Sequence, residues 1–342
     1  MLAPLNALRR AAALRILRTL LLAAPLAALS RLAPAQAQAP AQAQARERPL
    51  RLIVPVSTGT STDLVVRTLA GALSEALGQA LVIDNLPGAG GIVGTVALVK
   101  AVPDGYTVGV VSNSHAINQS VYRKPPFDAN TDVTPIMVML STPIVLVVSS
   151  ASVPAGNLQQ LLAWLTARPG AANYGSIGNG SLGHLCAELF AREAHVDIKH
   201  IPYKSLSQLL ADLIGGQVQL AFLGLPGAQA FLKRGVLRAI GVCAPTRAAA
   251  MPELPTLLEQ GLAEPQVAGW FAMVGPAHLP AAEVRRLHSA LVATLATADV
   301  RERLQAQGNV VDAGSPEAAT RFLRAETARY AAIVKKLGLS IE

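Results

Sequence analysis

Residues 50–63 read LRLIVPVSTGTSTD, a strand-like run followed by a polar turn and the start of a helix. Leu50–Val56 is mostly apolar and β-branched, as is typical of a buried strand. Thr62–Leu77 has helical character, with Ser61 or Thr62 available as the cap and Asp63 in the first turn. A strand that leads through a short turn into a helix is the basic unit of an α/β fold.

The same order recurs along the chain. A second helix is predicted at Ile92–Lys100, and further strands at Leu81–Asp84, Tyr106–Val111, Ile144–Val148, Ala172–Ser176, Ile198–Ile201, Val218–Phe222 and Leu237–Val242. This alternation predicts mostly parallel sheets covered by helices on both faces. The strands are too many for one compact open sheet, so we expect two sheets in two α/β domains. The predicted junctions lie near Ser149–Val153 and Val267–Val274.

These junctions divide the chain into 49–150 plus 270–342 as domain 1 and 151–269 as domain 2. Residues 1–37 are predicted to be a Sec-type signal peptide, because four arginines precede the apolar run Thr19–Leu29 and the small-residue site Ala35-Gln36-Ala37. Residues 38–48, rich in Pro, Ala and Gln, are predicted to be a mobile leader. The expected location is therefore the periplasm.

The composition favours a globular protein and excludes a nucleic-acid-binding role. Hydrophobic residues make up 51% of the 342 residues and charged residues 15%. The net charge of +8 falls to +3 without residues 1–37, which hold five arginines and no acid. That is too small for the basic surface of a nucleic-acid-binding protein. Cys186 and Cys243 are open to either interpretation, a disulfide or two buried thiols.

Two small-residue turns between a strand and a helix are predicted to bind an anion through backbone N–H groups. The alternative is that each is an ordinary polar turn. The candidate ligand contacts are Ser57, Thr58, Gly59, Thr60 and Asp63 in the first turn, Ser176, Asn179, Gly180, Ser181 and His184 in the second, and, elsewhere, Ser112, His115 and Leu223. A third glycine-rich turn, Asn85–Gly94, is predicted to be structural.

Enzyme chemistry finds little support in the sequence. Gly178-x-Gly180-x-x-Gly183 matches the dinucleotide fingerprint, which leaves a nicotinamide-dependent oxidoreductase as an alternative, but the motif lies mid-chain after a short strand. There is no Gly-x-Ser-x-Gly nucleophile turn, and the six histidines show no metal-ligand spacing. We therefore expect a protein that is not an enzyme, with no cofactor and no metal.

An ordered series of motifs resembles the Bug family, the extracytoplasmic solute receptors of tripartite tricarboxylate transporters. The resemblance covers nearly all of the chain from Leu50 onward. Its motifs are residues 50–55 with Gly59 and Asp63, Asn85–Gly94, Pro103–Thr107, Tyr174–Leu185, Pro202–Lys204, Gly215–Val218, Pro255–Gly261 and Trp270.

The resemblance implies a type II periplasmic-binding-protein fold, in which two α/β domains joined by two crossing strands enclose a ligand. It implies a small organic acid or related molecule as ligand, held mainly by backbone N–H groups, small polar side chains and water. The implied partners are membrane transporter subunits, although a sensor that signals to a membrane kinase would have the same fold. We expect a monomer.

The sequence departs from the family pattern at three positions. Thr60 stands where a second glycine is usual, Leu223 and Gly224 replace a frequent Asp, and Ser205 replaces a glycine. The missing acid puts a ligand with an ammonium group in doubt.

Overall fold

The computed structural model describes residues 48–341. The predicted signal peptide and almost all of the predicted leader therefore lie outside the described residues. In the described part of the chain, no helix is both long enough and apolar enough to cross a membrane.

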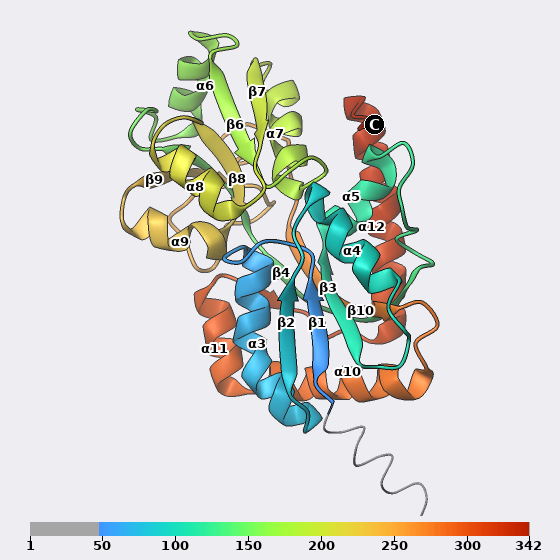
Figure 1. Ribbon diagram of the computed structural model, residues 1–342. Helices are drawn as coiled ribbons and strands as arrows, with labels where there is room; N and C mark the ends of the chain where they lie inside the picture. Colours follow the sequence, from blue (N-terminus) through green and yellow to red (C-terminus); the bar gives the residue numbers. More distant parts are fainter. Residues whose placement is uncertain (1–47, 342) are drawn as a thin grey trace, which may run out of the picture. The chain divides into compact units, whose positions relative to one another are not determined.

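The strands form two separate sheets (Figure 1). The first has the order β11-β4-β10-β3-β1-β2, and the second has the order β7-β6-β8-β5-β9. The strands of the first sheet are β1 (Leu50–Val54), β2 (Leu81–Asn85), β3 (Thr107–Ser112), β4 (Val133–Thr142), β10 (Gly269–Pro276) and β11 (Val310–Val311). Those of the second are β5 (Ile144–Ser149), β6 (Ala172–Ser176), β7 (Ile198–Pro202), β8 (Leu220–Gly224) and β9 (Leu237–Val242).

Both sheets are mixed, so the prediction of mostly parallel sheets is wrong. In the first sheet β1 pairs in parallel with β2 and β3, whereas β10 runs antiparallel to β3 and β4. In the second sheet β6 pairs in parallel with β7 and β8, and β5 runs antiparallel to β8 and β9. β4, β5 and β10, which adjoin the crossings between the sheets, run antiparallel to both of their neighbours.

The chain passes between the sheets twice, and the two passages lie side by side. β4 ends at Thr142 and β5 begins at Ile144 in the other sheet, so the first passage lies at Pro143 and not at the predicted Ser149–Val153. The return passage ends where Gly269 pairs with Thr142. We call residues 50–142 and 269–341 the first lobe and residues 143–268 the second lobe; that they are separate domains remains a prediction.

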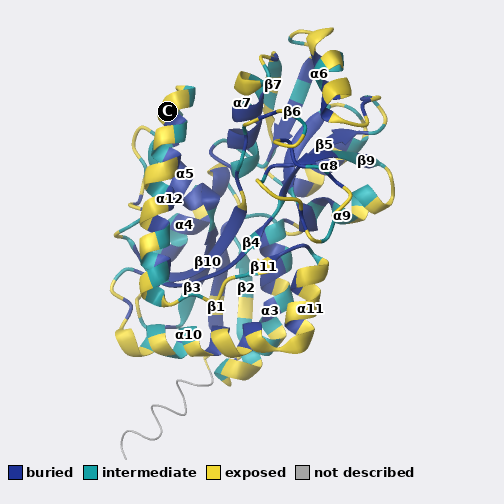
Figure 2. Cartoon of the chain, turned by 180° about the vertical axis from the view of Figure 1, so that it is seen from behind, coloured by how far each residue is buried: buried dark blue, intermediate teal, exposed yellow. Residues whose placement is uncertain are grey.

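Helices cover both faces of the first sheet (Figure 1). One hydrophobic cluster joins the sheet to α3, α10 and α11, and another joins its opposite face to α4, α5 and α12. Burial in Figure 2 follows this arrangement, because the central strands β1, β3, β4 and β10 are mostly dark and the outward helix faces are exposed. The bounds are α3 (Ser61–Leu77), α4 (Ile92–Val99), α5 (Asn113–Val121), α10 (Ala281–Ala296), α11 (Ala298–Ala306) and α12 (Pro316–Leu337), with a short 3₁₀ turn η2 (Ala89–Gly91) before α4.

The second sheet is also covered on both faces. α6 and α7 contribute to one hydrophobic cluster, and α8 and α9 contribute to the other. The helices are α6 (Leu158–Thr166), α7 (Leu182–Glu193), α8 (Leu206–Ile214) and α9 (Leu225–Lys233). Cys186 and Cys243 are both buried in this lobe and are free thiols. Burial raises the pKa of both thiols.

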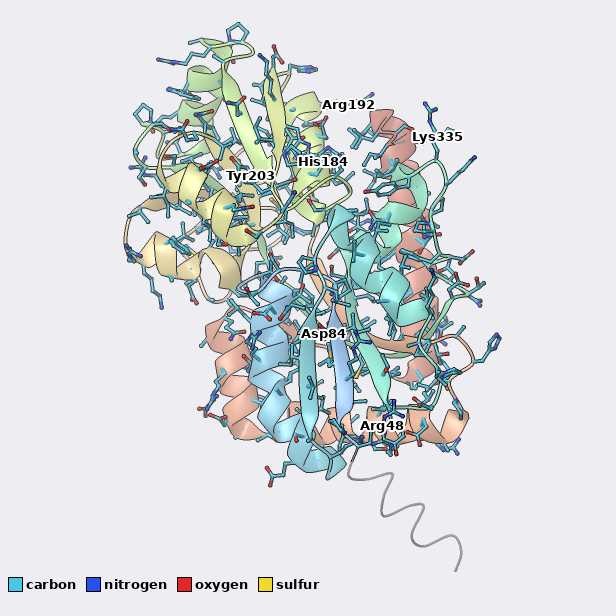
Figure 3. The ribbon with its side chains drawn as sticks, viewed as in Figure 1. Arg48, Asp84, His184, Arg192, Tyr203 and Lys335 are labelled. Carbon is cyan, nitrogen blue, oxygen red and sulfur yellow. The ribbon has the colours of Figure 1, made fainter. Side chains whose placement is uncertain are left out.

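The two lobes touch at several points. Leu206 N donates to Ser57 Oγ at 3.2 Å, and Gln229 Nε2 donates to Ala306 O at 3.0 Å. Arg192 of α7 reaches the end of α12 that carries Lys335 (Figure 3), where its Nη1 donates to Lys336 O. The space between the lobes is therefore bounded by direct contacts.

Candidate functional site

The first predicted turn is braced by its own polar groups. Thr60 is the N-cap of α3, in place of the predicted Ser61 or Thr62, and its hydroxyl accepts from Asp63 N and donates to Ser57 O. Gly59, at φ +79°, directs its N–H to Asp63 Oδ2 at 2.9 Å. The turn is thus fixed before any ligand arrives, and it leaves Ser61 and Thr62 at the start of the helix.

Asp63 holds this turn from behind. Its carboxylate is 1% exposed and accepts from Gly59 N, Arg67 Nε and Asn85 Nδ2. Burial raises the pKa of this carboxyl, but the Arg67 and other donors outweigh it and hold the pKa below its usual value. Asp63 therefore braces the turn, and a contact between Asp63 and a ligand stays a prediction.

The second predicted turn is also internally bonded. Ser181 caps α7, as its position before the helix predicts, and its hydroxyl accepts from His184 N at 3.4 Å. Gly180 N donates to His184 Nδ1 at 3.3 Å, and Ser176 Oγ both accepts from Gly178 N and donates to Gly178 O. Ser176 and His184 therefore shape the turn and line none of the three cavities described below.

Behind the second turn, three aromatic rings stack. The centroid of His184 lies 4.2 Å from that of His200, which lies 4.8 Å from that of Tyr174 (His184 is labelled in Figure 3). Burial, together with the charge of His184, lowers the pKa of His200 to about 3. Burial also lowers the pKa of His184, although Glu188 opposes it. Both imidazoles are neutral at neutral pH, so neither adds positive charge to the turn.

A cavity of about 100 Å³ lies beside the two passages between the lobes, and we call it the crossing-strand cavity. Thr142, Ile144 and Gly269 of the passages form part of its wall. Its remaining lining residues are Val56, Thr60, Ser61, Thr62, Ser112, Asn113, Ser114, Ile177, Leu182, Gly183, Leu206, Phe222, Leu223, Gly224, Gly227 and Phe271. None of these residues, all in the described chain, carries a charged side chain.

The starts of five helices contribute to this lining. The cavity is lined by Ser61 and Thr62 of α3, by Asn113 and Ser114 of α5, by residues 182–183 of α7, by residue 206 of α8, and by residues 224 and 227 at the start of α9. α5 has no side-chain cap, so its first N–H groups are available. At the start of α9, Leu225 N donates to Pro143 O and Pro226 has no N–H, and at the start of α8 Leu206 N donates to Ser57 Oγ. The first N–H groups of a helix lack partners inside the helix and carry partial positive charge. The cavity therefore offers an anion several backbone donors and no fixed positive charge.

Thr142, in the same wall, has a buried hydroxyl. This residue is 2% exposed, and its Oγ1 has no hydrogen-bond partner within the described chain. A buried hydroxyl without a partner costs free energy unless a ligand or water satisfies it. Among the described lining residues, Thr142 is therefore the one whose side chain carries a buried, unsatisfied polar atom.

A larger cavity, of about 440 Å³, lies between two glycine-rich turns, and we call it the glycine-loop cavity. One wall is the turn that includes Gly88, Gly90 and Gly91, and the other includes Gly178 and Asn179. Lys204 is the one charged residue among its described lining residues. It shares Val56, Ser114 and Ile177 with the crossing-strand cavity, so the two are neighbours.

Contact between the glycine turns is too close for side chains. A Cβ on Gly90 would lie 2.1 Å from Asn179 O, and a Cβ on Gly180 would lie 2.2 Å from Asn118 Oδ1. Asn118, on α5, also donates from Nδ2 to Gly90 O at 3.1 Å. The turn within Asn85–Gly94, predicted to be only structural, thus forms a contact between the lobes.

The predicted site residues separate into three groups. Thr60, Ser112 and Leu223 line the crossing-strand cavity, and Ser57, Asn179 and Ser181 line the glycine-loop cavity. Thr58, Gly59, Asp63, Ser176, Gly180 and His184 line neither. The first two of these are exposed, and the other four support the turns or the contact between the lobes.

His115 lies apart from the ligand-sized cavities. Its Nε2 bonds to Ala129 O at 2.9 Å, and its ring stacks on Phe127. It lines a third cavity of about 10 Å³, the size of a single water molecule. Burial lowers the pKa of His115 to about 4, so this histidine is a neutral core residue.

The glycines of the dinucleotide-like motif are used for packing. Gly178 N and Gly180 N have acceptors within the turn, and a Cβ on Gly183 would lie 2.7 Å from Phe222 O. The turn therefore does not present free N–H groups at these two glycines, as pyrophosphate binding requires. Among the described residues, no group of three or more His, Cys, Asp or Glu is arranged to hold a metal ion.

Sequence reasoning missed several residues that line the crossing-strand cavity. Ser61, Thr62, Asn113 and Ser114 each follow the carboxyl end of a strand, which is where open α/β sheets bind ligands. That signal could have identified them. Thr142 had no such signal, because the strand that carries it was not predicted.

Comparisons with known proteins agree with this architecture. Residues 65–339 match the model of the tripartite tricarboxylate transporter family receptor. The chain is 34% identical to a UPF0065 protein of Bordetella pertussis, over 85% of this chain and 90% of that protein. It is 32% identical to the protein BugT of the same organism, over 86% and 91% of the two chains.

Solved structures are similar over the same region. The periplasmic binding protein BugD superposes with a TM-score of 0.83 and 28% identity, covering 86% of this chain and 99% of that one. Rpa4515 of R. palustris with adipate superposes with a TM-score of 0.82 and 33% identity, covering 86% of this chain and 99% of that one. MatC from Rhodopseudomonas palustris with bound malate superposes with a TM-score of 0.80 and 27% identity, covering 84% of this chain and 99% of that one.

These matches confirm both the predicted resemblance and the predicted periplasmic-binding-protein fold with two α/β sheets. The family model spans most of the chain, and the relatives are matched over nearly their whole length. The chain belongs to the receptor family of the tripartite tricarboxylate transporters.

Proposed function

We propose that this protein is a periplasmic receptor that captures a small carboxylate in the crossing-strand cavity and delivers it to a membrane transporter. The observation that carries the proposal is the convergence of five helix starts on a cavity lined by no charged side chain. The partial positive charges at helix N-termini are suited to a carboxylate. Rpa4515 with adipate and MatC with malate, both similar in fold, support the same class of ligand.

In this proposal the first lobe holds the anion and the second lobe covers it. Ser61, Thr62 and Ser114 lie on the first lobe, as does Thr142 at its edge. Thr60, the N-cap of α3, keeps the start of that helix in place. The contact between the glycine turns then fixes how closely the lobes approach.

The partner is a set of transporter subunits in the membrane, as the family name of the receptor implies. A sensor that signals to a membrane kinase would share this fold. The protein works as a monomer that reaches the periplasm through its signal peptide. It binds its ligand without changing it, so it is a receptor and not an enzyme.

A thermal-shift screen of mono-, di- and tricarboxylates, aromatic acids and amides tests the proposal. A ligand that binds the native state raises its melting temperature by mass action, by several degrees at concentrations well above Kd. We expect at least one carboxylate to do so, and to be recovered unchanged. A nicotinamide cofactor that binds, or turnover of the ligand by the purified protein, would contradict the receptor assignment.

A further inference from the structure

We propose that this receptor selects an acid with one carboxylate and a short, uncharged, apolar body. The inference rests on the proposed function and specifies the ligand class. Its basis is that the wall of the crossing-strand cavity is divided, with donors on one side and hydrocarbon on the other.

The polar side comes from the first lobe. Ser61 and Thr62 at the start of α3, Ser114 at the start of α5, and Thr142 at the end of β4 all lie there. The uncapped start of α5 makes its first N–H groups available to an acceptor. These donors of the first lobe are thus suited to one anionic group.

The opposite side comes mainly from the second lobe and is apolar. It is formed by Ile144, Ile177, Leu182, Leu206, Phe222 and Leu223. Phe222 and Leu223 are 3% and 7% exposed, so a ligand group placed against them leaves water almost completely. A second carboxylate or an ammonium group there would be buried without a partner, which costs far more than burying a methyl group.

The volume limits the size of the apolar body. A cavity of about 150 Å³ lined by hydrocarbon accommodates benzene. The crossing-strand cavity measures about 100 Å³ and must also hold the carboxylate. The apolar body must therefore be short.

A longer ligand could instead extend past Val56 and Ile177 into the glycine-loop cavity, where Lys204 is exposed. A diacid bound in this way would pair its second carboxylate with Lys204. The two arrangements predict opposite preferences between acids of equal length.

Two matched ligand pairs distinguish these arrangements by titration calorimetry. Pentanoate and glutarate share a five-carbon chain, and glutarate adds a second carboxylate. The other pair, 4-methylpentanoate and leucine, shares a skeleton, and leucine adds an ammonium group. We expect pentanoate to bind at least tenfold more tightly than glutarate, and 4-methylpentanoate at least tenfold more tightly than leucine.

Two variants test which side of the cavity binds the carboxylate and which side binds the apolar body. Thr142→Val preserves the shape of the side chain and removes its hydroxyl, so it should weaken the binding of pentanoate and of glutarate by a similar factor. Leu223→Ala removes part of the apolar wall, so it should weaken the binding of pentanoate more than that of glutarate. The ratio of the two dissociation constants should therefore move closer to one. Leu258→Ala, at an exposed position outside the cavity lining, is the control and should change neither.

Tighter binding of glutarate or leucine would overturn the inference while leaving the receptor function intact. If the glutarate preference also disappeared in Lys204→Ala, the ligand would extend through both cavities. If none of these acids, nor malate or adipate, bound at all, the inference and the proposed function would both fail.

Discussion

Gly180→Ala tests whether the contact between the glycine turns is needed for tight binding. Gly180 has φ +74°, and a Cβ there would lie 2.2 Å from Asn118 Oδ1 on the other lobe. That is more than about 1 Å short of the separation at which non-bonded atoms normally settle. To relieve this overlap, either Asn118 must move or the two lobes must separate. Asn118 is 1% exposed and bonded to Gly90 O, so it has little freedom to move.

Two contributions set the expected free-energy cost of Gly180→Ala. Alanine at positive φ costs about 1 kcal/mol relative to glycine. Forcing an extra methyl group into a tight contact costs about 1–3 kcal/mol more. If lobe separation relieves the overlap, the second contribution appears as lost affinity, because only the fraction of molecules with closed lobes binds. A loss of about 1–3 kcal/mol is about a 5- to 150-fold increase in Kd.

Gly235→Ala is the matched control. Gly235 has φ +70°, and no atom lies within 4 Å of the position that a Cβ would take, so the substitution carries the backbone cost without the overlap. We expect both variants to lose similar thermal stability and only Gly180→Ala to lose affinity, measured by calorimetry with the tightest acid from the screen. Adding Asn118→Ala to Gly180→Ala should recover part of the lost affinity. Equal ligand affinities for Gly180→Ala and Gly235→Ala would refute the argument.

Three further predictions concern stability and processing. Asp63→Ala should lower the free energy of unfolding by about 1–3 kcal/mol in urea titrations, because it leaves the Gly59 N–H and Asn85 Nδ2 without their buried acceptor; an unchanged midpoint would contradict the bracing role. The pKa of His200 is about 3 when folded and near 6.5 when unfolded, so the unfolded state binds more protons between these values and stability should fall as pH drops from 6.5 towards 3. His200→Phe keeps a stacked ring without the titrating nitrogen, so its melting temperature should depend less on pH over that range; an equal dependence would remove His200 as the cause. N-terminal sequencing of periplasmic protein should begin near Gln38, and Met1 on most of the exported chain would disprove cleavage.

Most strands that alternate with helices could be predicted from sequence, but the long strand β4 could not. Predicted and observed bounds agree to within one or two residues for β1, β6 and α3. β4, Val133–Thr142, contains Pro135, which normally argues against a central strand. The strand tolerates this proline near an irregularity in its pairing with β10, where the register shifts between Met273 and Val274. That irregularity depends on a partner strand far away in the sequence, so no local pattern reveals it.

The same reason limits what sequence shows of the site. Both predicted turns line a cavity in part, because small residues between a strand and a helix are a local signal. α5 is different: Asn113, Ser114, His115 and Asn118 are polar and buried, so its composition resembles a surface segment. Asn113 is satisfied by Tyr330 OH and by the backbone of residues 268 and 270, all distant in sequence. Burial of this kind is decided by tertiary packing and cannot be read from the segment alone.

The absence of charged side chains from the described lining of the crossing-strand cavity also explains how the lobes can approach closely. A lysine or arginine in the crossing-strand cavity would be buried without a partner whenever the lobes met without a ligand, at a cost of several kcal/mol. Helix N-termini carry only partial charge and avoid that cost. If the first lobe supplies such uncharged donors for any carboxylate, discrimination between acids falls to the side chains of the second lobe, among them Phe222 and Leu223. Substitutions there should change which acid binds while leaving the anion-binding donors of the first lobe in place.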